Sequence, residues 1–363
     1  MRRLLKYKNY AQQLRVYSRL RQLFVYGTPK KIWNAVRTNR AYRRRHIDVR
    51  SRPYLLCIEP LYYCNLACPL CQRQTFPDAR KNDAGRLSLD IYDKILDEIG
   101  DYLIKCNIYG LGEPLMDWNL TRSVIEKTHK RRIFTEVSTN CTLVTPKIAQ
   151  EIVNCGLDFL SCAIDGVTQE TYSKYRVGGS VEKALAGLRM ICEEKRKQRS
   201  SMEIQWQYLV NRFSAPEMDR AREIAEEIGV FLRFEQFGGT EGDEQLQNYW
   251  LSDLPKYSAK IAPGHSFNPC QCKWLWCGVV INSNGQLARC TAYANTAMLG
   301  NVGERSVMEI YNGPESQRAR QLFYKGEVPD GEFPMPCDTC MYYKREHGAK
   351  NQIEMRRPAA SAV

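Results

Sequence analysis

Three cysteine thiols lie within eight residues, in the segment Cys64-Asn65-Leu66-Ala67-Cys68-Pro69-Leu70-Cys71. Thiolates bind soft metals, and three of them on one short loop can hold three corners of an iron–sulfur cube. So compact a loop leaves the fourth iron without a local protein ligand. An iron with an open position can bind a small molecule and do chemistry on it. The alternative is a structural cysteine loop or a zinc site.

A second group of six cysteines lies near the C-terminal end of the sequence, at Cys270, Cys272, Cys277, Cys290, Cys337 and Cys340. The segment between Cys272 and Cys290 predicts a β-hairpin, because an apolar run at residues 279–281 precedes Asn284-Gly285, a pair typical of hairpin turns. Thiols then lie on both arms of the hairpin, and Cys337 and Cys340 add a chelating C-x2-C pair. This spacing suits zinc as well as an iron–sulfur cluster.

The 15 cysteines occur in a chain with no recognisable secretory signal. Its N-terminal residues are rich in Arg and Lys and lack the apolar run of about 7–15 residues that a signal peptide has. No stretch approaches the roughly 18 consecutive apolar residues that a membrane span needs. Clustered cysteines in this setting predict metal ligands in a reducing cytoplasm rather than disulfides.

The positive charge of the chain is confined to its N-terminal segment. Residues 1–50 hold 15 Lys or Arg and one acid, a net charge of +14, whereas the other 313 residues hold 38 basic and 39 acidic residues. Apolar residues recur at three- and four-residue steps through residues 4–24, and a second helix is predicted to begin at Thr28-Pro29 and to contain Ile32, Trp33 and Val36. The pattern predicts a basic helical arm that either contacts an anionic membrane or packs on the body of the protein. Nucleic acid is a third candidate for the same charge.

From residue 55 to residue 235 the chain alternates between short apolar runs and helical periods. The predicted strands are Leu55–Glu59, Leu103–Tyr109, Phe134–Ser138, Phe159–Ile164, Met202–Val210 and Phe231–Phe234. Helix starts are predicted at Ser88, at Thr145-Pro146 and, as a capping box, at Ser214–Glu217. Six strand–helix units predict a parallel sheet with right-handed crossovers, and hence an α/β fold with a partial (β/α)6 TIM-type barrel.

Functional groups of such a barrel gather on the loops that follow its strands. The cysteine loop follows the first predicted strand, Gly110-Leu111-Gly112-Glu113-Pro114 follows the second, Ser138-Thr139-Asn140 closes the third, and Asp165-Gly166 closes the fourth. All four segments are therefore expected at one mouth.

These segments, in this order, resemble the radical S-adenosylmethionine (SAM) superfamily, in which Cys64, Cys68 and Cys71 would hold a 4Fe–4S cluster and SAM would chelate its open iron. The resemblance implies that the Gly-Glu-Pro segment binds the SAM amino group and that the Ser-Thr-Asn segment lies near the ribose and methionine. Arg176 is a candidate either for the SAM carboxylate or for a structural ion pair. The implied cofactor-binding residues are Gly112, Glu113, Pro114, Ser138, Asn140, Asp165 and Arg176. The sequence departs from the family pattern at Leu70, Cys141 and Ala163.

The C-terminal cysteines resemble the SPASM/twitch extension of the same superfamily, including a C-x12-G-x4-C spacing counted from Cys272. The preferred ligands of an auxiliary 4Fe–4S cluster are Cys272, Cys290, Cys337 and Cys340. Cys277 competes for the first position, and Cys270 is a weaker competitor. Because no cysteine follows Cys340, a single auxiliary cluster is expected. The predicted organisation is a basic arm (1–50), the barrel (51–236), a linker over its mouth (237–269), the small cysteine-rich domain (270–345) and a flexible tail (346–363).

The resemblance implies an enzyme that cleaves SAM reductively and uses the 5′-deoxyadenosyl radical to remove a hydrogen atom from its substrate. The predicted reaction is the oxidation or rearrangement of a sugar, an aminocyclitol or a lipid-linked metabolite. A SPASM-type maturase of a ribosomally made peptide is the alternative, and a non-catalytic cysteine-rich metal-binding protein is an alternative of another class. A one-electron donor such as flavodoxin or ferredoxin is an expected partner, and nucleic acid is not. The expected location is the cytoplasm, with peripheral contact to the inner face of the membrane through residues 1–50.

Overall fold

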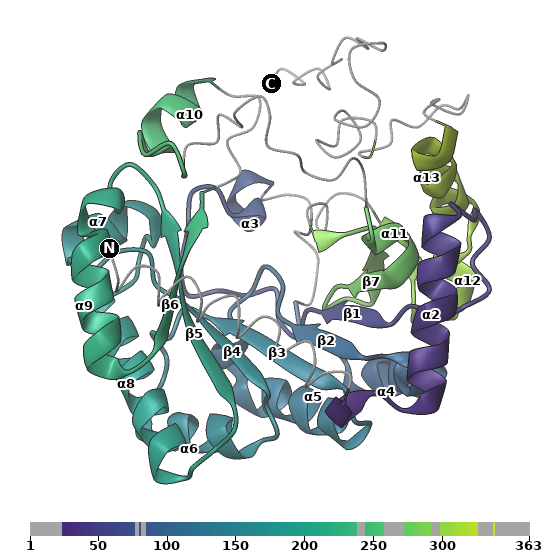
Figure 1. The fold of residues 1–363 in the computed structure, drawn as a ribbon, viewed down its shortest axis with the longest axis horizontal. Helices are drawn as coiled ribbons and strands as arrows, with labels where there is room; N and C mark the ends of the chain where they lie inside the picture. The colour runs from purple at the N-terminus through teal and green to yellow at the C-terminus, as the bar shows by residue number, and fades with distance from the viewer. Residues whose placement is uncertain are drawn as a thin grey trace.

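A parallel β-sheet, curved into an open barrel, forms the centre of the molecule (Figure 1). The computed structural model describes residues 24–76, 80, 85–237, 244–257, 272–291, 298–325 and 337. All six predicted strands are present and each pairs in parallel with the next, which confirms the partial barrel. They are β1 (Leu55–Ile58), β2 (Lys105–Ile108), β3 (Phe134–Thr139), β4 (Phe159–Ala163), β5 (Glu203–Val210) and β6 (Phe231–Gln236).

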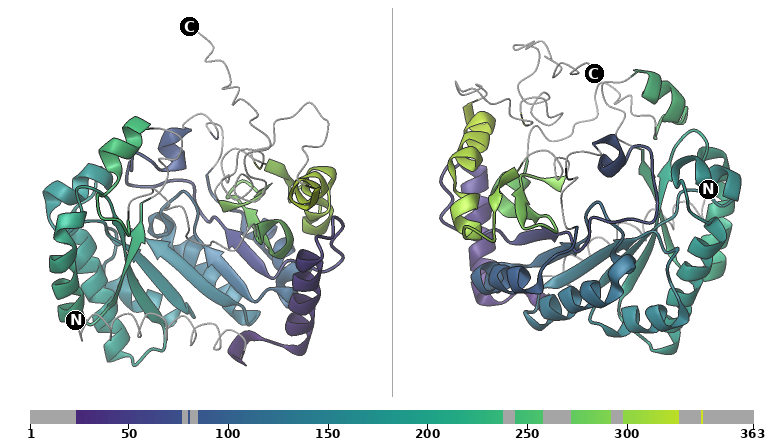
Figure 2. Two further views of the ribbon diagram at one scale, coloured as in Figure 1. Left: turned by 45° about the horizontal axis from the view of Figure 1, so that its top comes forward. Right: turned by 180° about the vertical axis from the view of Figure 1, so that it is seen from behind.

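Amphipathic helices cover the outer face of this sheet (Figure 2). The helix between β1 and β2 is typical, because Tyr92, Ile95, Leu96 and Ile99 recur at helical spacing and are all buried against the sheet. The covering helices are α4 (Leu89–Ile99), α5 (Trp118–Lys130), α6 (Pro146–Asn154), α7 (Gln169–Tyr175), α8 (Val181–Lys197) and α9 (Met218–Ile228). Short 3-10 turns precede or follow some of them, at η1 (Gly100–Tyr102), η2 (Pro114–Asp117) and η3 (Ala215–Glu217).

The C-terminal region extends the same sheet. The predicted hairpin is confirmed, with β7 (Gly278–Ile281) antiparallel to β8 (Gln286–Ala288) and Gly285 at φ 81° in the turn. Strand β7 also pairs in parallel with β1, so the sheet continues through β7, β8 and β9 (Met298–Asn301) to nine strands. Three helices flank this extension, α11 (Trp274–Cys277), α12 (Val307–Tyr311) and α13 (Pro314–Lys325).

The second half of the predicted basic arm packs on the body of the protein. Helix α2 (Pro29–Arg43) begins where expected, with the Thr28 side chain accepting a hydrogen bond from the Lys31 backbone N–H. Near its end, the ring of Tyr42 lies 5.7 Å from the ring of Trp276, centroid to centroid. The part of the arm before residue 24 lies outside the described residues, as do most of the linker and the whole predicted tail.

The capping box predicted at Ser214 is wrong. The Ser214 hydroxyl donates to the Leu209 carbonyl, and the Glu217 carboxylate accepts hydrogen bonds from Val167 and Thr168 instead of capping its own helix. Glu217 therefore ties the loop after β4 to the start of α9. Within the part of the chain that the structure describes, no helix is both long and apolar enough to cross a bilayer.

Candidate active site

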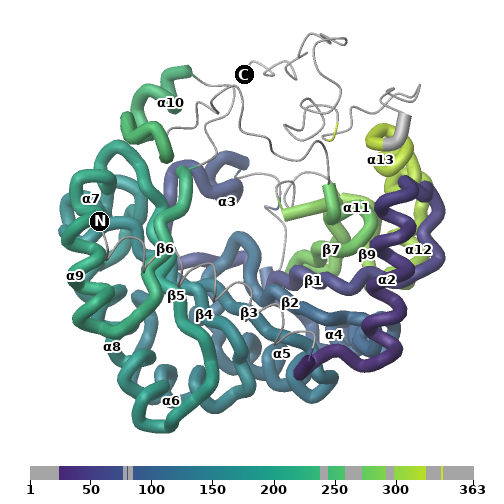
Figure 3. The backbone as a smooth tube through the Cα atoms, viewed as in Figure 1, coloured from purple at the N-terminus to yellow at the C-terminus, as the bar shows by residue number. Residues whose placement is uncertain are grey.

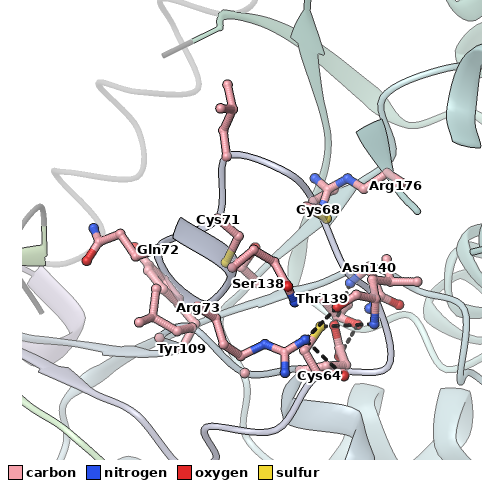
Figure 4. Close-up of a pocket in the computed structure, with 18 of the residues that line it drawn as sticks. Cys64, Cys68, Cys71, Gln72, Arg73, Tyr109, Ser138, Thr139, Asn140 and Arg176 are labelled. Carbon is pink, nitrogen blue, oxygen red and sulfur yellow. Dashed lines mark hydrogen bonds between the residues drawn. The ribbon is translucent and has the colours of Figure 1, made fainter. Parts of the chain in front are cut away.

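A cavity of about 330 Å3 opens at the carboxyl ends of the barrel strands (Figure 4). The three thiols of the cysteine loop line it together with residues from the loops after β2, β3 and α7. Its volume lies at the lower end of the roughly 300–1,000 Å3 typical of ligand pockets. The short helix α3 (Gln72–Thr75), which follows the cysteine loop directly, forms part of the rim.

Local hydrogen bonds shape the cysteine loop. The Cys71 backbone N–H donates to the Cys68 carbonyl at 3.0 Å, and the Cys71 carbonyl accepts from Thr75 at 2.9 Å in the first turn of α3. The guanidinium of Arg73 folds back and donates to the carbonyls of Leu66 at 2.7 Å and Cys64 at 3.4 Å. These bonds hold the three thiols in a fixed arc.

Neighbouring loops hold the same segment from outside. The Asn65 side chain accepts a hydrogen bond from the Asn140 amide at 3.0 Å, and the Ala67 N–H donates to the Val177 carbonyl at 2.9 Å. The Glu113 N–H donates to the Tyr63 carbonyl at 2.7 Å. The loops after β2, β3 and α7 therefore position the cysteine loop by hydrogen bonds to its backbone and to Asn65.

The close contact between the cysteine loop and the loop after β2 requires a glycine at position 112. A Cβ atom at this position would lie 2.1 Å from the Leu61 carbonyl oxygen and 2.7 Å from that of Tyr63. Both are backbone atoms that cannot turn aside, so only glycine lets the two loops approach so closely. The glycine thus serves the contact between the loops, a role that the sequence did not reveal.

The Glu113 carboxylate lies in the cavity wall, is almost completely buried and accepts three hydrogen bonds from the described residues. Its donors are the Leu115 N–H at 3.1 Å, the Thr139 hydroxyl at 2.7 Å and the Asn140 N–H at 2.8 Å. Burial raises the pKa of Glu113, and these donors and Arg176 partly oppose the rise. The carboxylate thereby joins the loop after β2 to the end of β3. A direct contact of Glu113 with the SAM amino group stays a prediction.

Arg176 forms a buried ion pair that reaches the cysteine loop. Its Nε lies 2.6 Å from the Asp165 carboxylate, which also accepts the Leu209 N–H at 2.7 Å. Its Nη1 donates toward the Cys68 sulfur at 3.8 Å. Burial lowers the pKa of Arg176, but Asp165 and the Cys68 thiolate outweigh it, so the net pKa is raised and the guanidinium stays charged. A permanent positive charge therefore lies beside one thiol.

The predicted site residues fall into two groups. Those that line the cavity are Cys64, Cys68, Cys71, Gly112, Glu113, Ser138, Asn140 and Arg176. Pro114 and Asp165 lie behind it, at the start of η2 and under Arg176 respectively. Sequence reasoning missed several lining side chains, because they are scattered along the chain and belong to no motif: Arg73, Tyr109 and Gln207.

Aromatic side chains gather at the rim beside Tyr175. The Tyr175 ring lies 4.9 Å from Phe237 and 5.7 Å from Trp250, and Phe237 stacks on Trp250 at 5.4 Å, all between ring centroids. Trp250 ends helix α10 (Glu244–Trp250), which lies above the mouth of the barrel (Figure 1). Part of the predicted linker thus packs on a residue that lines the cavity.

A buried ion pair links the site to the C-terminal extension. Glu59, at the end of β1, pairs with Arg80 at 2.6 Å, and both side chains are almost completely buried. The same carboxylate accepts the Leu111 N–H at 2.9 Å and the Ser283 N–H at 3.1 Å. Glu59 thus connects the cavity wall to the turn of the β7–β8 hairpin.

Of the C-terminal cysteines, the four that the structure describes do not line the cavity. Cys272 and Cys290 are half-buried, and the Cys337 sulfur accepts from Arg289 Nη1 at 3.8 Å. Cys277 lies in the main hydrophobic core, where its thiol adjoins Tyr54, and burial raises its pKa. Cys270 and Cys340 lie outside the described residues. Cys272 is more exposed than the fully buried Cys277, and it stays the predicted ligand on this side of the hairpin.

The first site suits an iron–sulfur cluster by its donor set. Three thiols face one cavity, and burial raises the pKa of Cys64 to about 11 and also raises that of Cys68, so metal binding must displace their protons. Among the described residues, no three His, Cys, Asp or Glu side chains converge closely enough to hold a single metal ion. A cubane cluster is larger than a single ion and is bound at its corners, so its cysteine ligands lie farther apart than those of one ion.

The fold and the cavity define an α/β-barrel protein whose mouth carries three cysteine thiols. The model of the radical SAM superfamily matches residues 58–204, and that of the SPASM iron–sulfur cluster-binding domain matches residues 270–341. The chain belongs to the radical SAM superfamily and to its branch with a C-terminal SPASM domain. The cofactors expected of these two domains are thereby confirmed, a 4Fe–4S cluster, SAM and an auxiliary cluster. That there is only one auxiliary cluster stays a prediction.

Two curated relatives illustrate this placement. The chain is 27% identical over 224 residues to an AdoMet-dependent heme synthase of Methanosarcina barkeri, a match that covers 58% of this chain and 61% of the relative. It is 25% identical over 231 residues to the mycofactocin maturase MftC of Mycobacterium tuberculosis, covering 59% of this chain and 55% of the relative. The chain thus spans little more than half the length of these relatives.

Solved structures share the fold. SuiB of Streptococcus suis superposes with a TM-score of 0.55 at 13% identity, over 80% of this chain and 72% of that one. The structure titled native anSMEcpe with bound AdoMet gives a TM-score of 0.53 at 16% identity, over 82% and 88% of the two chains. Both likenesses concern the fold.

Proposed function

We propose that the chain is a radical SAM enzyme that cleaves SAM reductively in the barrel cavity and removes a hydrogen atom from a peptide substrate. One observation carries the proposal: the three thiols of the cysteine loop and the segments around Gly112 and Ser138 line a single cavity at the ends of the parallel strands. Ligand and functional groups of α/β barrels gather at this end.

Each part of the chain has a distinct role in this proposal. Cys64, Cys68 and Cys71 hold the cluster. When bound, the cluster and SAM together supply a 5′-deoxyadenosyl radical after one electron is delivered, for which a flavodoxin or a ferredoxin is the proposed donor. The Arg176 guanidinium donates to the Cys68 sulfur and stabilises negative charge there. Enclosure by the barrel excludes water from the reacting groups.

The auxiliary cluster is proposed on Cys272, Cys290, Cys337 and Cys340. Its role is to accept the electron left on the substrate or to bind the substrate. The Glu59–Arg80 pair holds the turn of the neighbouring hairpin against the cavity wall, so the two regions keep a fixed relation.

A peptide is favoured over the sugar, aminocyclitol or lipid-linked metabolite expected from the sequence. The name of the mycofactocin maturase describes a maturation enzyme, and one structure that shares this fold is titled SuiB bound to precursor peptide SuiA, with a TM-score of 0.56.

A tetrapyrrole is the second candidate. Two relatives of Methanosarcina barkeri carry such names, the heme synthase and an Fe-coproporphyrin III synthase that is 27% identical over 132 residues. A flat macrocycle would have to lie across the mouth, where Tyr175 lines the cavity and the buried rings of Phe237 and Trp250 support it from behind.

The cleavage reaction is tested by anaerobic reconstitution and measurement of 5′-deoxyadenosine formed from SAM under a strong reductant. The Cys68→Ala variant should lose more than about 100-fold of this activity, because one cluster ligand is missing. Cys155→Ala, which removes a buried thiol that does not line the cavity, is the matched control and should retain it. Unchanged cleavage by Cys68→Ala would overturn the assignment.

The substrate class is tested by transfer of label. Cells of the organism that carries the gene are grown on deuterated medium, and their peptide, small-metabolite and lipid fractions are incubated separately with the reconstituted enzyme. When the radical removes a deuterium atom from the substrate, the deuterium is transferred to 5′-deoxyadenosine, where mass spectrometry detects it. Label from the peptide fraction is expected. Deuterium in 5′-deoxyadenosine after incubation with the small-metabolite or lipid fraction alone would contradict a peptide substrate. If the substrate in the small-metabolite fraction has the absorbance of a tetrapyrrole, the second candidate is supported.

A further inference from the structure

Helix α2 is attached to the body of the protein through its polar side. Lys31, Asn34 and Thr38 recur at helical spacing and are almost completely buried. The Lys31 ammonium donates to the Arg131 carbonyl at 3.0 Å, and Asn34 and Thr38 bind the Arg52 backbone at 2.9–3.0 Å. Ala41 and Tyr42 are buried at the C-terminal end of α2, but its first turns bury polar side chains and expose apolar ones, the reverse of the usual arrangement of a surface helix.

The apolar side of α2 faces outward. Trp33 and Val36 are 63% and 62% exposed, Ile32 is 42% exposed, and just before the helix Phe24 and Val25 are 82% and 46% exposed. We call these five residues the apolar patch. Scattered exposed apolar residues need no explanation, but five that adjoin one helix on one flank indicate a contact surface. Helix α2 lies at the outer edge of the molecule, beside α12 and α13 (Figure 3).

Positive charge continues the apolar patch along the same helix. Arg37, Arg40, Arg43 and Arg44 are exposed and follow Val36 within two turns. The Arg37 guanidinium lies 4.5 Å from the centre of the Trp33 ring. No acidic residue occurs within α2, and the first after it is Asp48. The exposed side of the helix is therefore apolar at its beginning and basic at its end.

We infer that the exposed side of α2 docks the enzyme on an anionic lipid surface. Apolar side chains and a tryptophan next to arginines fit the boundary between acyl chains and negatively charged headgroups, where each basic residue contributes about 1 kcal/mol. A second copy of the chain fits less well, because a symmetric contact through this side would bring two sets of four arginines together.

This docking leaves the active site accessible. Helix α2 lies at the right edge of the molecule in Figure 1, and α10 lies on the opposite side, at the upper left. A membrane bound to the exposed side of α2 would not cover α10. The inference rests on α2 and on Phe24 and Val25 before it, and it holds whichever substrate the enzyme takes.

The test is flotation of the full chain with vesicles of phosphatidylcholine alone or with 30% phosphatidylglycerol. Binding is expected only to the anionic vesicles and should weaken at high salt. The double variant Trp33→Ser/Val36→Ser should bind them about tenfold more weakly or worse, because it loses the inserted apolar side chains. Arg37→Gln/Arg40→Gln should reduce binding at low salt and make it less sensitive to salt.

Met116→Ser/Leu254→Ser is the matched control, since it removes two half-exposed apolar side chains outside α2 and should bind as the wild type does. All these positions are exposed, and unchanged thermal unfolding will show that the variants fold. Full vesicle binding by Trp33→Ser/Val36→Ser would overturn the inference. So would loss of self-association in that variant, measured by sedimentation, with vesicle binding unaltered, because the surface would then be a contact between subunits.

Discussion

The two cysteine sites differ in how the chain builds them. The first takes its three thiols from eight consecutive residues at the end of β1, and the surrounding loops hold their backbone. The second draws its candidates from the two sides of the hairpin, with Cys272 before α11 and Cys290 after β8, and from Cys337 more than forty residues later. The ligands of a site built from neighbouring residues can be recognised in the sequence. The ligands of a dispersed site cannot, because the fold decides which of its cysteines come together.

Both sites nevertheless place an arginine against one thiol. Arg176 approaches Cys68 and Arg289 approaches Cys337, each with 3.8 Å between nitrogen and sulfur. Arg176 is held by the buried Asp165 carboxylate. The Nε of Arg289 is buried and, among the described residues, has no hydrogen-bond partner. The Arg176 guanidinium at the first site is therefore held by an ion pair, whereas the Nε of Arg289 at the second site is not held by a hydrogen bond to any described residue.

The largest expected effect is a change in iron content, and it is measured in two cysteine variants at the second site. Cys290→Ala should lose about four irons per chain, the content of one 4Fe–4S cluster, whereas Cys277→Ala should keep them because its thiol lies in the core beside Tyr54. Iron and sulfide analysis after reconstitution measures both. Loss of iron in Cys277→Ala with none in Cys290→Ala would reverse the ligand assignment.

The dependence of the first site on its neighbouring loops is tested at Gly112. Gly112→Ala places a methyl group against two backbone carbonyls and should lower the free energy of unfolding by about 3 kcal/mol or more. The control is Gly100→Ala, where the nearest atom lies at 3.6 Å and the backbone is helical, and where a change within about 1 kcal/mol is expected. Denaturant titration of the two variants should separate them; equal stability would mean that the loop contact is not rigid.

The two arginines allow a smaller and more specific test. Arg176→Met should lower the reduction potential of the first cluster and leave the second unchanged, since a hydrogen bond to the thiolate stabilises the reduced form. Arg289→Met should lower the reduction potential of the second cluster and leave that of the first unchanged. Because Arg176→Met leaves Asp165 buried without its partner, Arg176→Met/Asp165→Asn is measured beside it. Redox titrations followed by EPR give both potentials. A potential that does not move in either Arg176 variant would refute the role of this contact.

The smallest effect concerns Cys141, which stands where family members usually have glycine. Its backbone has φ 62°, in the left-handed region that costs a non-glycine residue about 1 kcal/mol or more, and its side chain is fully buried. Cys141→Gly should therefore be at least as stable as Cys141→Ala, which loses the sulfur but keeps the strain. A more stable alanine variant in chemical denaturation would show that the strain is negligible.

The sequence predicted the barrel well, because each strand is a short apolar run followed by a helical period. The cysteine loop, Gly112 and Asn140 were found because they belong to motifs that follow strands directly. What the sequence did not provide are contacts between distant segments. The partners of Glu113 and Glu217 lie in other loops, so the ammonium-binding role expected of the first stays a prediction and the capping role of the second was wrong. Trp33 was placed on a helix, but burial of the polar side of that helix depends on the Arg52 and Arg131 carbonyls.

In the proposed function SAM binds to the cluster on the cysteine loop and not to the C-terminal one. EPR of the reduced Cys290→Ala protein, which should carry only the first cluster, is recorded with and without SAM. SAM should change the EPR signal, because this cluster has an iron with no protein ligand. An identical signal with and without SAM would show that SAM does not bind there.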